Sequence, residues 1–155
     1  MSFQIVQIQQ VSSGLCLGVD QPTAFLNTPT MVYAACPEAT FYNLTTTNNV
    51  NYNISPIGKP TSCVDTFEHI VTAEVITSNP DKNPFFNACP SFFWQLTESN
   101  GVYNIFAIDE NTDLPICLDS KDAKIGGPAY VFNCNSTSTS TSPTLNFKIT
   151  TIATA

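Results

Sequence analysis

The sequence predicts a single all-β domain over residues 1–155, built from three copies of a unit of about 50 residues. Three observations predict this fold class. Two short motifs occur three times in the same order. Six cysteines are distributed so that each copy contains two of them. Short runs of alternating apolar and polar residues are separated by turn residues, which is typical of β-strands joined by hairpins.

The two motifs set the bounds of the copies. The first is an aromatic residue, an amide residue and isoleucine, followed by another isoleucine, and it occurs at Phe3–Ile8, Tyr52–Ile57 and Tyr103–Ile108. The second is an aromatic, a polar and an aliphatic residue, and it occurs at Tyr42–Leu44, Trp94–Leu96 and Phe147–Ile149. Since one motif opens each copy and the other closes it, the copies span about residues 1–47, 48–100 and 101–155.

The cysteines stand between these motifs in every copy, and the first of each pair is followed by leucine or valine. The pairs are Cys16 with Cys36, Cys63 with Cys89, and Cys117 with Cys134. The repeat therefore predicts one disulfide within each copy, each stabilising the fold by about 3 kcal/mol through loop closure. Six buried free thiols are the alternative. No Cys-x-x-Cys pair is present, so zinc and redox motifs are not supported.

Turn residues divide each copy into short strands. Asn100-Gly101 lies between Trp94–Leu96 and the apolar run that begins at Val102, and Asn-Gly in that position is a strong hairpin signal. Eleven prolines and the cluster Gly126-Gly127-Pro128 disfavour long helices. Each copy then has room for about four strands of ordinary length.

About twelve short strands need an arrangement that protects the sheet edges. Three four-stranded units around a pseudo-threefold axis achieve this as a β-trefoil, in which the closing motifs would fill the barrel. A sandwich of two sheets is the alternative, but it does not explain a threefold period. We therefore expect a β-trefoil with one disulfide per repeat.

The charge composition excludes some partners. The net charge is −7 with only five Lys and Arg residues, so a nucleic acid or an anionic membrane would be repelled. No apolar run is long enough to span a bilayer, and we expect no membrane insertion. Met1 to Ile5 do not look like a signal peptide. Disulfides favour an extracellular or secreted protein, as a mature chain or by unconventional export, while a cytoplasmic location stays open.

No constellation of residues indicates an enzyme, a metal or a cofactor. His69 is the only histidine, and it is typical of a solvated loop residue. The run Asp109–Asp113 places oxygen ligands as a calcium loop does, but Leu114 and Ser120 stand where that loop needs glycine and glutamate. Two isolated aspartates do not make the carboxylate pair of a glycosidase. We expect a binding protein without a cofactor.

The cysteine motif and the closing motif together resemble the ricin-type (ricin B-like) β-trefoil lectin domain. The resemblance rests on Cys63–Asp65 with Cys89–Leu96, and on Cys117–Asp119 with Tyr130–Cys134 and Leu145–Ile149. It covers nearly the whole chain and implies a carbohydrate-binding lectin whose partners are glycans or glycoproteins. The family's Gln-x-Trp motif is incomplete here, because Thr40, Phe92 and Leu145 replace its glutamine.

The resemblance also implies sugar-binding residues. In that family an aspartate two positions after the first cysteine accepts hydrogen bonds from sugar hydroxyls. An aromatic residue two positions before the second cysteine stacks on the apolar face of the sugar. The first repeat has Gly18 and Ala34 at these positions, so its site is lost. The candidates in the third repeat are Asp119, Tyr130, Phe132, Asn135 and Asn146, and those in the second are Asp65, Phe85 and Asn87.

Simpler interpretations stand beside the lectin hypothesis. Asp119 could cap a turn beside Lys121, and Tyr130 and Phe132 could be core residues. Fold analogy also allows a β-trefoil protease inhibitor that acts through the exposed loop Thr66–Phe86. A third possibility is a trefoil that binds another protein rather than a sugar, such as a toxin or effector component.

Overall fold

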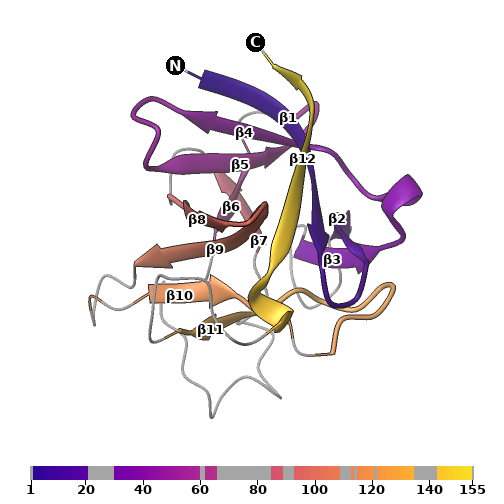
Figure 1. Ribbon diagram of the computed structural model, residues 1–155. Helices are drawn as coiled ribbons and strands as arrows, with labels where there is room; N and C mark the ends of the chain where they lie inside the picture. Colours follow the sequence, from indigo (N-terminus) through magenta and orange to yellow (C-terminus); the bar gives the residue numbers. More distant parts are fainter. Residues whose placement is uncertain are drawn as a thin grey trace.

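The computed structural model describes residues 2–20, 30–59, 62–65, 85–88, 93–108, 113, 115–120, 122–134 and 143–154. Within these residues the chain forms β-strands, two short 3-10 helices and no α-helix, which confirms the all-β prediction (Figure 1). The strands are β1 (Ser2–Gln10), β2 (Cys16–Asp20), β3 (Thr30–Ala34), β4 (Tyr42–Thr46), β5 (Tyr52–Pro56), β6 (Ser62–Asp65), β7 (Phe85–Ala88), β8 (Gln95–Ser99), β9 (Val102–Ile108), β10 (Pro115–Leu118), β11 (Val131–Asn133) and β12 (Phe147–Thr154).

Six strands are linked by antiparallel pairings that return to their starting point. β1 pairs with β4 and β12, β4 with β5, β8 with β9, and β9 with β12. The link between β5 and β8 is the bridge of Tyr52 with Trp94, whose two backbone hydrogen bonds measure 2.8 and 2.9 Å. We call β1, β4, β5, β8, β9 and β12 the ring.

The other six strands form three hairpins, β2–β3, β6–β7 and β10–β11. Their registers are equivalent, because the first cysteine of each copy lies opposite the residue two positions before the second. The pairs are Cys16 with Ala34, Cys63 with Asn87, and Cys117 with Phe132. The hairpins also contact one another through Thr30 with Phe85 and through Val32 with Pro128.

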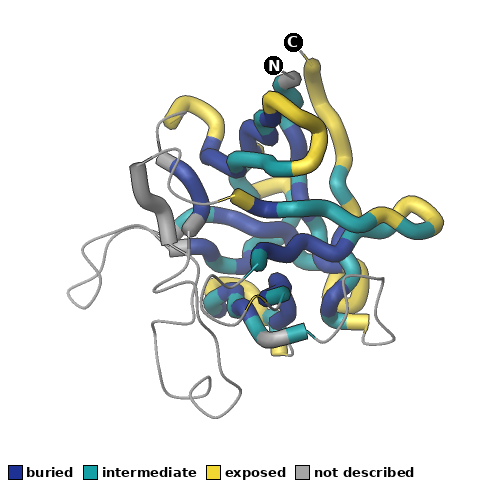
Figure 2. The backbone as a smooth tube through the Cα atoms, turned by 90° about the vertical axis from the view of Figure 1, so that its left-hand side faces the viewer, coloured by how far each residue is buried: buried dark blue, intermediate teal, exposed yellow. Residues whose placement is uncertain are grey.

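The core is built from residues of both the ring strands and the hairpins, and Figure 2 shows the buried residues gathered in the middle of the molecule. The closing aromatics Tyr42, Trp94 and Phe147 are completely buried, as the motif predicts. The residues that follow the first cysteine of each copy are also buried, at Leu17, Val64 and Leu118. Exposed residues gather at the turns and in the last part of β12.

The ring pairings recur in each copy, but with a different alignment of the first motif. Tyr52 pairs with Trp94 and Tyr103 with Phe147, and the corresponding partner of Tyr42 is Val6. The first-copy residue in this role is therefore Val6, three positions beyond Phe3. The sequence comparison selected Phe3 because it is aromatic. The pairing selects Val6 because it points into the core, where it is fully buried.

Two of the three predicted disulfides are confirmed. Cys16 is bonded to Cys36, and Cys117 to Cys134. Cys63 is also disulfide-bonded, while its expected partner Cys89 lies outside the described residues. In the described part of the chain every cysteine is oxidised, so the free-thiol alternative does not hold there.

Candidate functional site

The third-repeat candidates meet at the β10–β11 hairpin. The Asp119 backbone N–H donates to the Tyr130 carbonyl at 3.0 Å, so these two residues lie opposite each other. The Tyr130 N–H donates to Ser120 Oγ, also at 3.0 Å. The rings of Tyr130 and Phe132 are in edge-to-face contact, with centroids 6.4 Å apart. Both side chains are half-buried, so each keeps part of its ring at the surface.

Asp119 is far more buried than a sugar-binding carboxylate is expected to be. It is only 4% exposed, and the Thr144 hydroxyl donates to its Oδ1. Thr144 belongs to the 3-10 helix Pro143–Leu145, which precedes β12. The carboxylate therefore holds this short helix against the hairpin. That arrangement favours the capping interpretation over direct contact with a ligand.

Asn146 follows the same 3-10 helix. Its carbonyl accepts a 2.9 Å hydrogen bond from the Val11 N–H, which connects β12 to the turn after β1. Its side-chain Oδ1 is buried and has no hydrogen-bond partner among the described residues. Asn135 lies outside the described residues. The structure thus brings Asp119, Tyr130, Phe132 and Asn146 to one region of the third repeat.

A buried glutamine that the sequence did not single out supports this region. Gln10 is completely buried, and its Nε2 donates to the carbonyls of Ser120 and Thr144 at 2.9 and 3.0 Å. The buried Tyr33 side chain also lies close to Asp119. Burial of the Tyr33 hydroxyl raises its pKa, and the charge of Asp119 raises it further. The net effect is a pKa well above the ordinary value.

The second-repeat candidates also lie across a hairpin. Asp65 is opposite Phe85, and Cys63 is opposite Asn87, in the pairing of β6 with β7. Only their backbone positions belong to the described structure. Most of the suspected inhibitor loop Thr66–Phe86 lies outside the described residues, as do His69 and the run 109–112.

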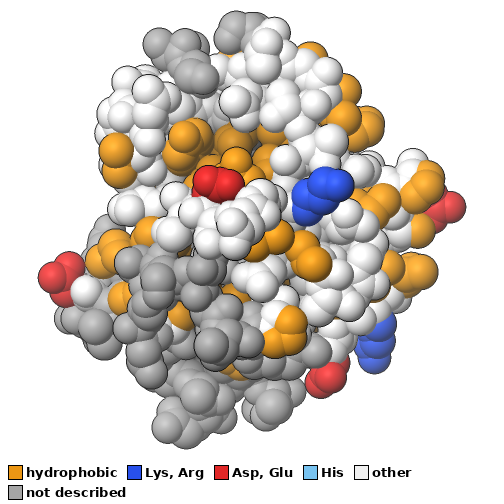
Figure 3. Space-filling model, viewed as in Figure 1, with side chains coloured by type: hydrophobic (Ala, Val, Ile, Leu, Met, Phe, Trp, Pro, Cys, Tyr) orange, Lys and Arg blue, Asp and Glu red, His pale blue; other side chains and the backbone are white. Residues whose placement is uncertain are grey.

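The described residues show neither a metal centre nor a membrane span. They contain no group of three or more His, Cys, Asp or Glu side chains placed to hold a metal ion. None of their helices has the length and apolar character needed to cross a bilayer. On the face shown in Figure 3, few of the described side chains are charged.

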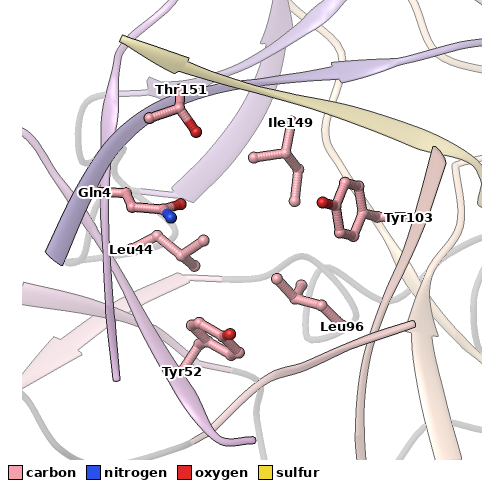
Figure 4. A pocket seen from close by; sticks show the side chains of 7 residues that line it. All are labelled: Gln4, Leu44, Tyr52, Leu96, Tyr103, Ile149 and Thr151. Atoms are coloured by element: carbon pink, nitrogen blue, oxygen red, sulfur yellow. The ribbon is translucent and has the colours of Figure 1, made fainter. Parts of the chain in front are cut away.

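A pocket lies at the end of the ring that faces away from the hairpins (Figure 4). Its lining comes from all six ring strands and consists of Gln4, Leu44, Tyr52, Leu96, Tyr103, Ile149 and Thr151. Sequence analysis placed no site here, although six of these residues belong to the repeated motifs, Thr151 being the exception. The signal was present as the aromatic residue of the first motif and the aliphatic residue of the second.

Comparisons with known proteins support the fold at low sequence identity. No protein-family model matches the sequence, and the curated proteins give no match. Among solved structures, the chain is similar to a salivary protein from Culex quiquefasciatus of the Cysteine and Tryptophan-Rich (CWRC) family. That likeness has a TM-score of 0.61 at 16% identity, and it covers 94% of this chain and 92% of that one.

The chain is also similar to the lysenin pore, with a TM-score of 0.56 at 8% identity. The match covers 97% of this chain but 46% of the lysenin chain, so this chain spans less than half of that protein's length. Identities this low show a shared fold and nothing about activity. Neither protein is described as a ricin-type lectin, so that family resemblance stays a prediction.

Proposed function

We propose that this chain is a β-trefoil module that binds glycans outside the cell and catalyses no reaction. The β-trefoil assignment is supported by the return of the ring pairings to β1 and by three hairpins of equivalent register. Export is supported by the disulfides and by the likeness to a salivary protein.

The observation that carries the glycan proposal is the Tyr130–Phe132 pair beside Asn146 and Asp119. A sugar offers an apolar CH face and a rim of hydroxyls, so it needs an aromatic surface bordered by polar groups. Two half-buried rings in edge-to-face contact provide such a surface with little freedom to move. In this proposal Tyr130 and Phe132 contact the sugar, and Asp119 positions the hairpin through Thr144.

Glycan-array binding of the oxidised protein tests the proposal, with Tyr130→Ala as the principal variant. Tyr103→Ala is the matched control, because Tyr103 is also half-buried but lines the pocket on the ring. We expect a defined set of glycans to bind, with a loss of about five- to twelvefold in Tyr130→Ala and little change in Tyr103→Ala, given a stacking contact of about 1–1.5 kcal/mol.

Asp119→Asn then separates the two roles of the carboxylate, because asparagine keeps an oxygen that Thr144 can donate to. Retained binding supports the positioning role, and lost binding supports the direct contact that the family resemblance implies. If the folded protein binds no glycan, the lectin proposal is wrong. The next measurement would then be protease inhibition by the chain with and without substitutions in Thr66–Phe86.

A further inference from the structure

We propose that Ser120 is the positioning residue of the hairpin site, because its hydroxyl ends the β10–β11 ladder at Tyr130 and so fixes the direction of the Tyr130 ring. The consequence for binding rests on the proposed glycan site, whereas the geometry belongs to the free chain. Ser120 did not stand among the sugar-binding candidates of the sequence. It is only 1% exposed, so it acts through Tyr130 and does not itself contact a ligand.

The β10–β11 ladder ends on a side chain rather than on the backbone. Its last regular pair is Leu118 with Val131. Asp119 and Tyr130 come next, and in a regular antiparallel ladder two such residues would exchange both backbone hydrogen bonds. The Asp119 N–H donates to the Tyr130 carbonyl at 3.0 Å, but the Tyr130 N–H donates to Ser120 Oγ, also at 3.0 Å. The serine hydroxyl therefore serves as the acceptor in place of a backbone carbonyl.

The first copy shows the same hairpin without a hydroxyl at this position. Val19 stands there, as the third residue after the first cysteine of its copy. The β2–β3 ladder runs on through Val19 opposite Met31 to Asp20 opposite Thr30. In the third copy the regular ladder has ended before Ser120 is reached. The hydroxyl thus accompanies a shorter ladder, which releases the residue opposite from strand geometry.

Buried hydrogen bonds hold Ser120 in place from the first copy. Its carbonyl accepts a 2.9 Å bond from Gln10 Nε2, and the same amide donates to the Thr144 carbonyl at 3.0 Å. The Thr144 hydroxyl donates in turn to Asp119 Oδ1. Gln10 is completely buried, and Asp119 is only 4% exposed. This connected network keeps both residues that bond the Tyr130 backbone in fixed positions.

A fixed backbone at Tyr130 restricts the directions that its ring can take, because the allowed rotamers depend on the backbone angles. The ring is in edge-to-face contact with Phe132, with centroids 6.4 Å apart. A sugar that stacks there meets a side chain that is already ordered. Binding then avoids the loss of entropy from ordering that side chain, which is worth about twofold to twelvefold in affinity.

The test compares Ser120→Ala with Ser55→Ala in the oxidised full chain. Ser55 is the matched control, because it is also buried and its Oγ accepts a hydrogen bond from Asn43 Nδ2 on the ring. NMR of the free chain gives two readouts, the hydrogen exchange of the Tyr130 amide and the contact between the Tyr130 and Phe132 rings. We expect Ser120→Ala to exchange that amide about twofold to twelvefold faster than Ser55→Ala does, and to weaken the ring contact.

Glycan-array binding should then fall about twofold to twelvefold in Ser120→Ala and stay unchanged in Ser55→Ala. Ser120→Thr keeps the hydroxyl, and threonine already stands at the corresponding position of the second copy as Thr66. This variant should restore both the protection of the Tyr130 amide and the binding. Gln10→Met releases the Ser120 carbonyl and should move the same Tyr130 signals, so it serves if Ser120→Ala does not fold.

The positioning role is wrong if Ser120→Ala leaves the Tyr130 amide exchange and the ring contact as they are in Ser55→Ala. It is also wrong if Ser120→Thr behaves as Ser120→Ala does. Unchanged glycan binding by a Ser120→Ala chain with a loosened Tyr130 would overturn the role of Ser120 in binding. If the unaltered chain binds no glycan, and Ser120→Ala still loosens Tyr130, the proposed function fails while the positioning role stands.

Discussion

Two large aromatic side chains reach the centre of the molecule because their polar tips find backbone partners there. The Tyr42 hydroxyl donates to the Gly18 carbonyl at 2.9 Å, and Trp94 Nε1 donates to the Val64 carbonyl at 3.0 Å. Phe147 takes the equivalent place in the third copy and needs no such partner. Each hydrogen bond runs from the six-stranded ring of the fold to one of the hairpins, so Tyr42 and Trp94 join the two parts of the molecule. The bonds also give these buried polar groups the partners that they need.

Burial of tyrosine hydroxyls predicts a loss of stability at alkaline pH. Burial raises the pKa of both Tyr42 and Tyr33 in the folded chain. The unfolded chain ionises its tyrosines near pH 10, so the folded state holds more protons above that pH. The stabilising effect is fully present below about pH 10, and each buried tyrosine costs about 1.4 kcal/mol for every pH unit above it.

Urea unfolding at a series of pH values from 8 to about 11 measures this dependence, in a range chosen around the ordinary tyrosine pKa. The double variant Tyr33→Phe with Tyr42→Phe should be less stable at pH 8 but should show a clearly shallower decline. An equal decline in both proteins would contradict the assignment.

Asp119 shows where residue-level prediction from sequence stops. Its place two positions after Cys117 made it a sugar-binding candidate, and in the structure it follows β10 with its N–H bonded to the Tyr130 carbonyl. Its burial depends on Thr144, which lies 25 positions away in sequence and meets it only in the folded chain. A family motif gives the position of such a carboxylate, whereas tertiary contacts decide what it binds.

At the scale of elements, the hairpins are the most predictable part of the molecule. Cys16 and Cys117 lie in the same register in β2 and β10, and each is bonded to a cysteine just beyond the partner strand. The repeat predicted these pairs, and the structure explains them because each hairpin brings its two ends together. The disulfide is thus a short cross-link at the base of each of these hairpins.

Removing either disulfide should destabilise the chain by a similar amount. The cysteines are 20 residues apart in the first copy and 17 apart in the third. Chain-entropy reasoning gives about 3 kcal/mol for loops of this size. Cys16→Ala with Cys36→Ala, and Cys117→Ala with Cys134→Ala, should each lower the unfolding free energy accordingly in denaturant titrations. A loss near zero for one pair would show that its hairpin is held by packing alone.

The first strand shows why a motif can be assigned to the wrong residues. β1 pairs with β4 in unbroken register from Ser2 to Val6, and this register places Val6, not Phe3, opposite Tyr42. Phe3 and Val6 are three positions apart, so the alternation of side chains along a strand puts them on opposite faces. The sequence does not show which of the two faces the core, so its alignment followed the aromatic residue.

At the scale of the whole molecule, the threefold period predicted about twelve strands, and the described residues form twelve with the closing aromatics in the core. The pocket on the ring could not be predicted, because its lining combines residues from β1 to β12 and exists only when all six strands are in place. The repeat predicts which residues each copy contains. The free space between the copies depends on how the six ring strands are arranged around it.

Gln10 joins the first strand to the last copy, and its replacement tests that connection. Gln10→Met keeps the shape but leaves the carbonyls of Ser120 and Thr144 without their donor. We expect a loss of about 1–3 kcal/mol in unfolding free energy, partly offset because the buried Oε1, which has no partner among the described residues, is also removed.

Gln9→Met is the matched control for that measurement, because Gln9 donates to Gly14 at an exposed position. Its effect should stay within about 0.5 kcal/mol. Equal losses in the two variants would mean that the buried amide makes no specific contribution.

The pairing of β1 with β12 has a consequence for biosynthesis. β1 leaves the ribosome before the other strands described here, yet one of its edges pairs with β12, from Gln4 with Thr154 to Gln10 with Phe147. At translation rates of about 5–20 residues per second, that edge waits roughly 7–30 s for its partner. During this interval the nascent chain carries an open strand edge, which other chains could pair with. The glutamines at positions 4, 7, 9 and 10 keep that waiting strand from being uniformly apolar.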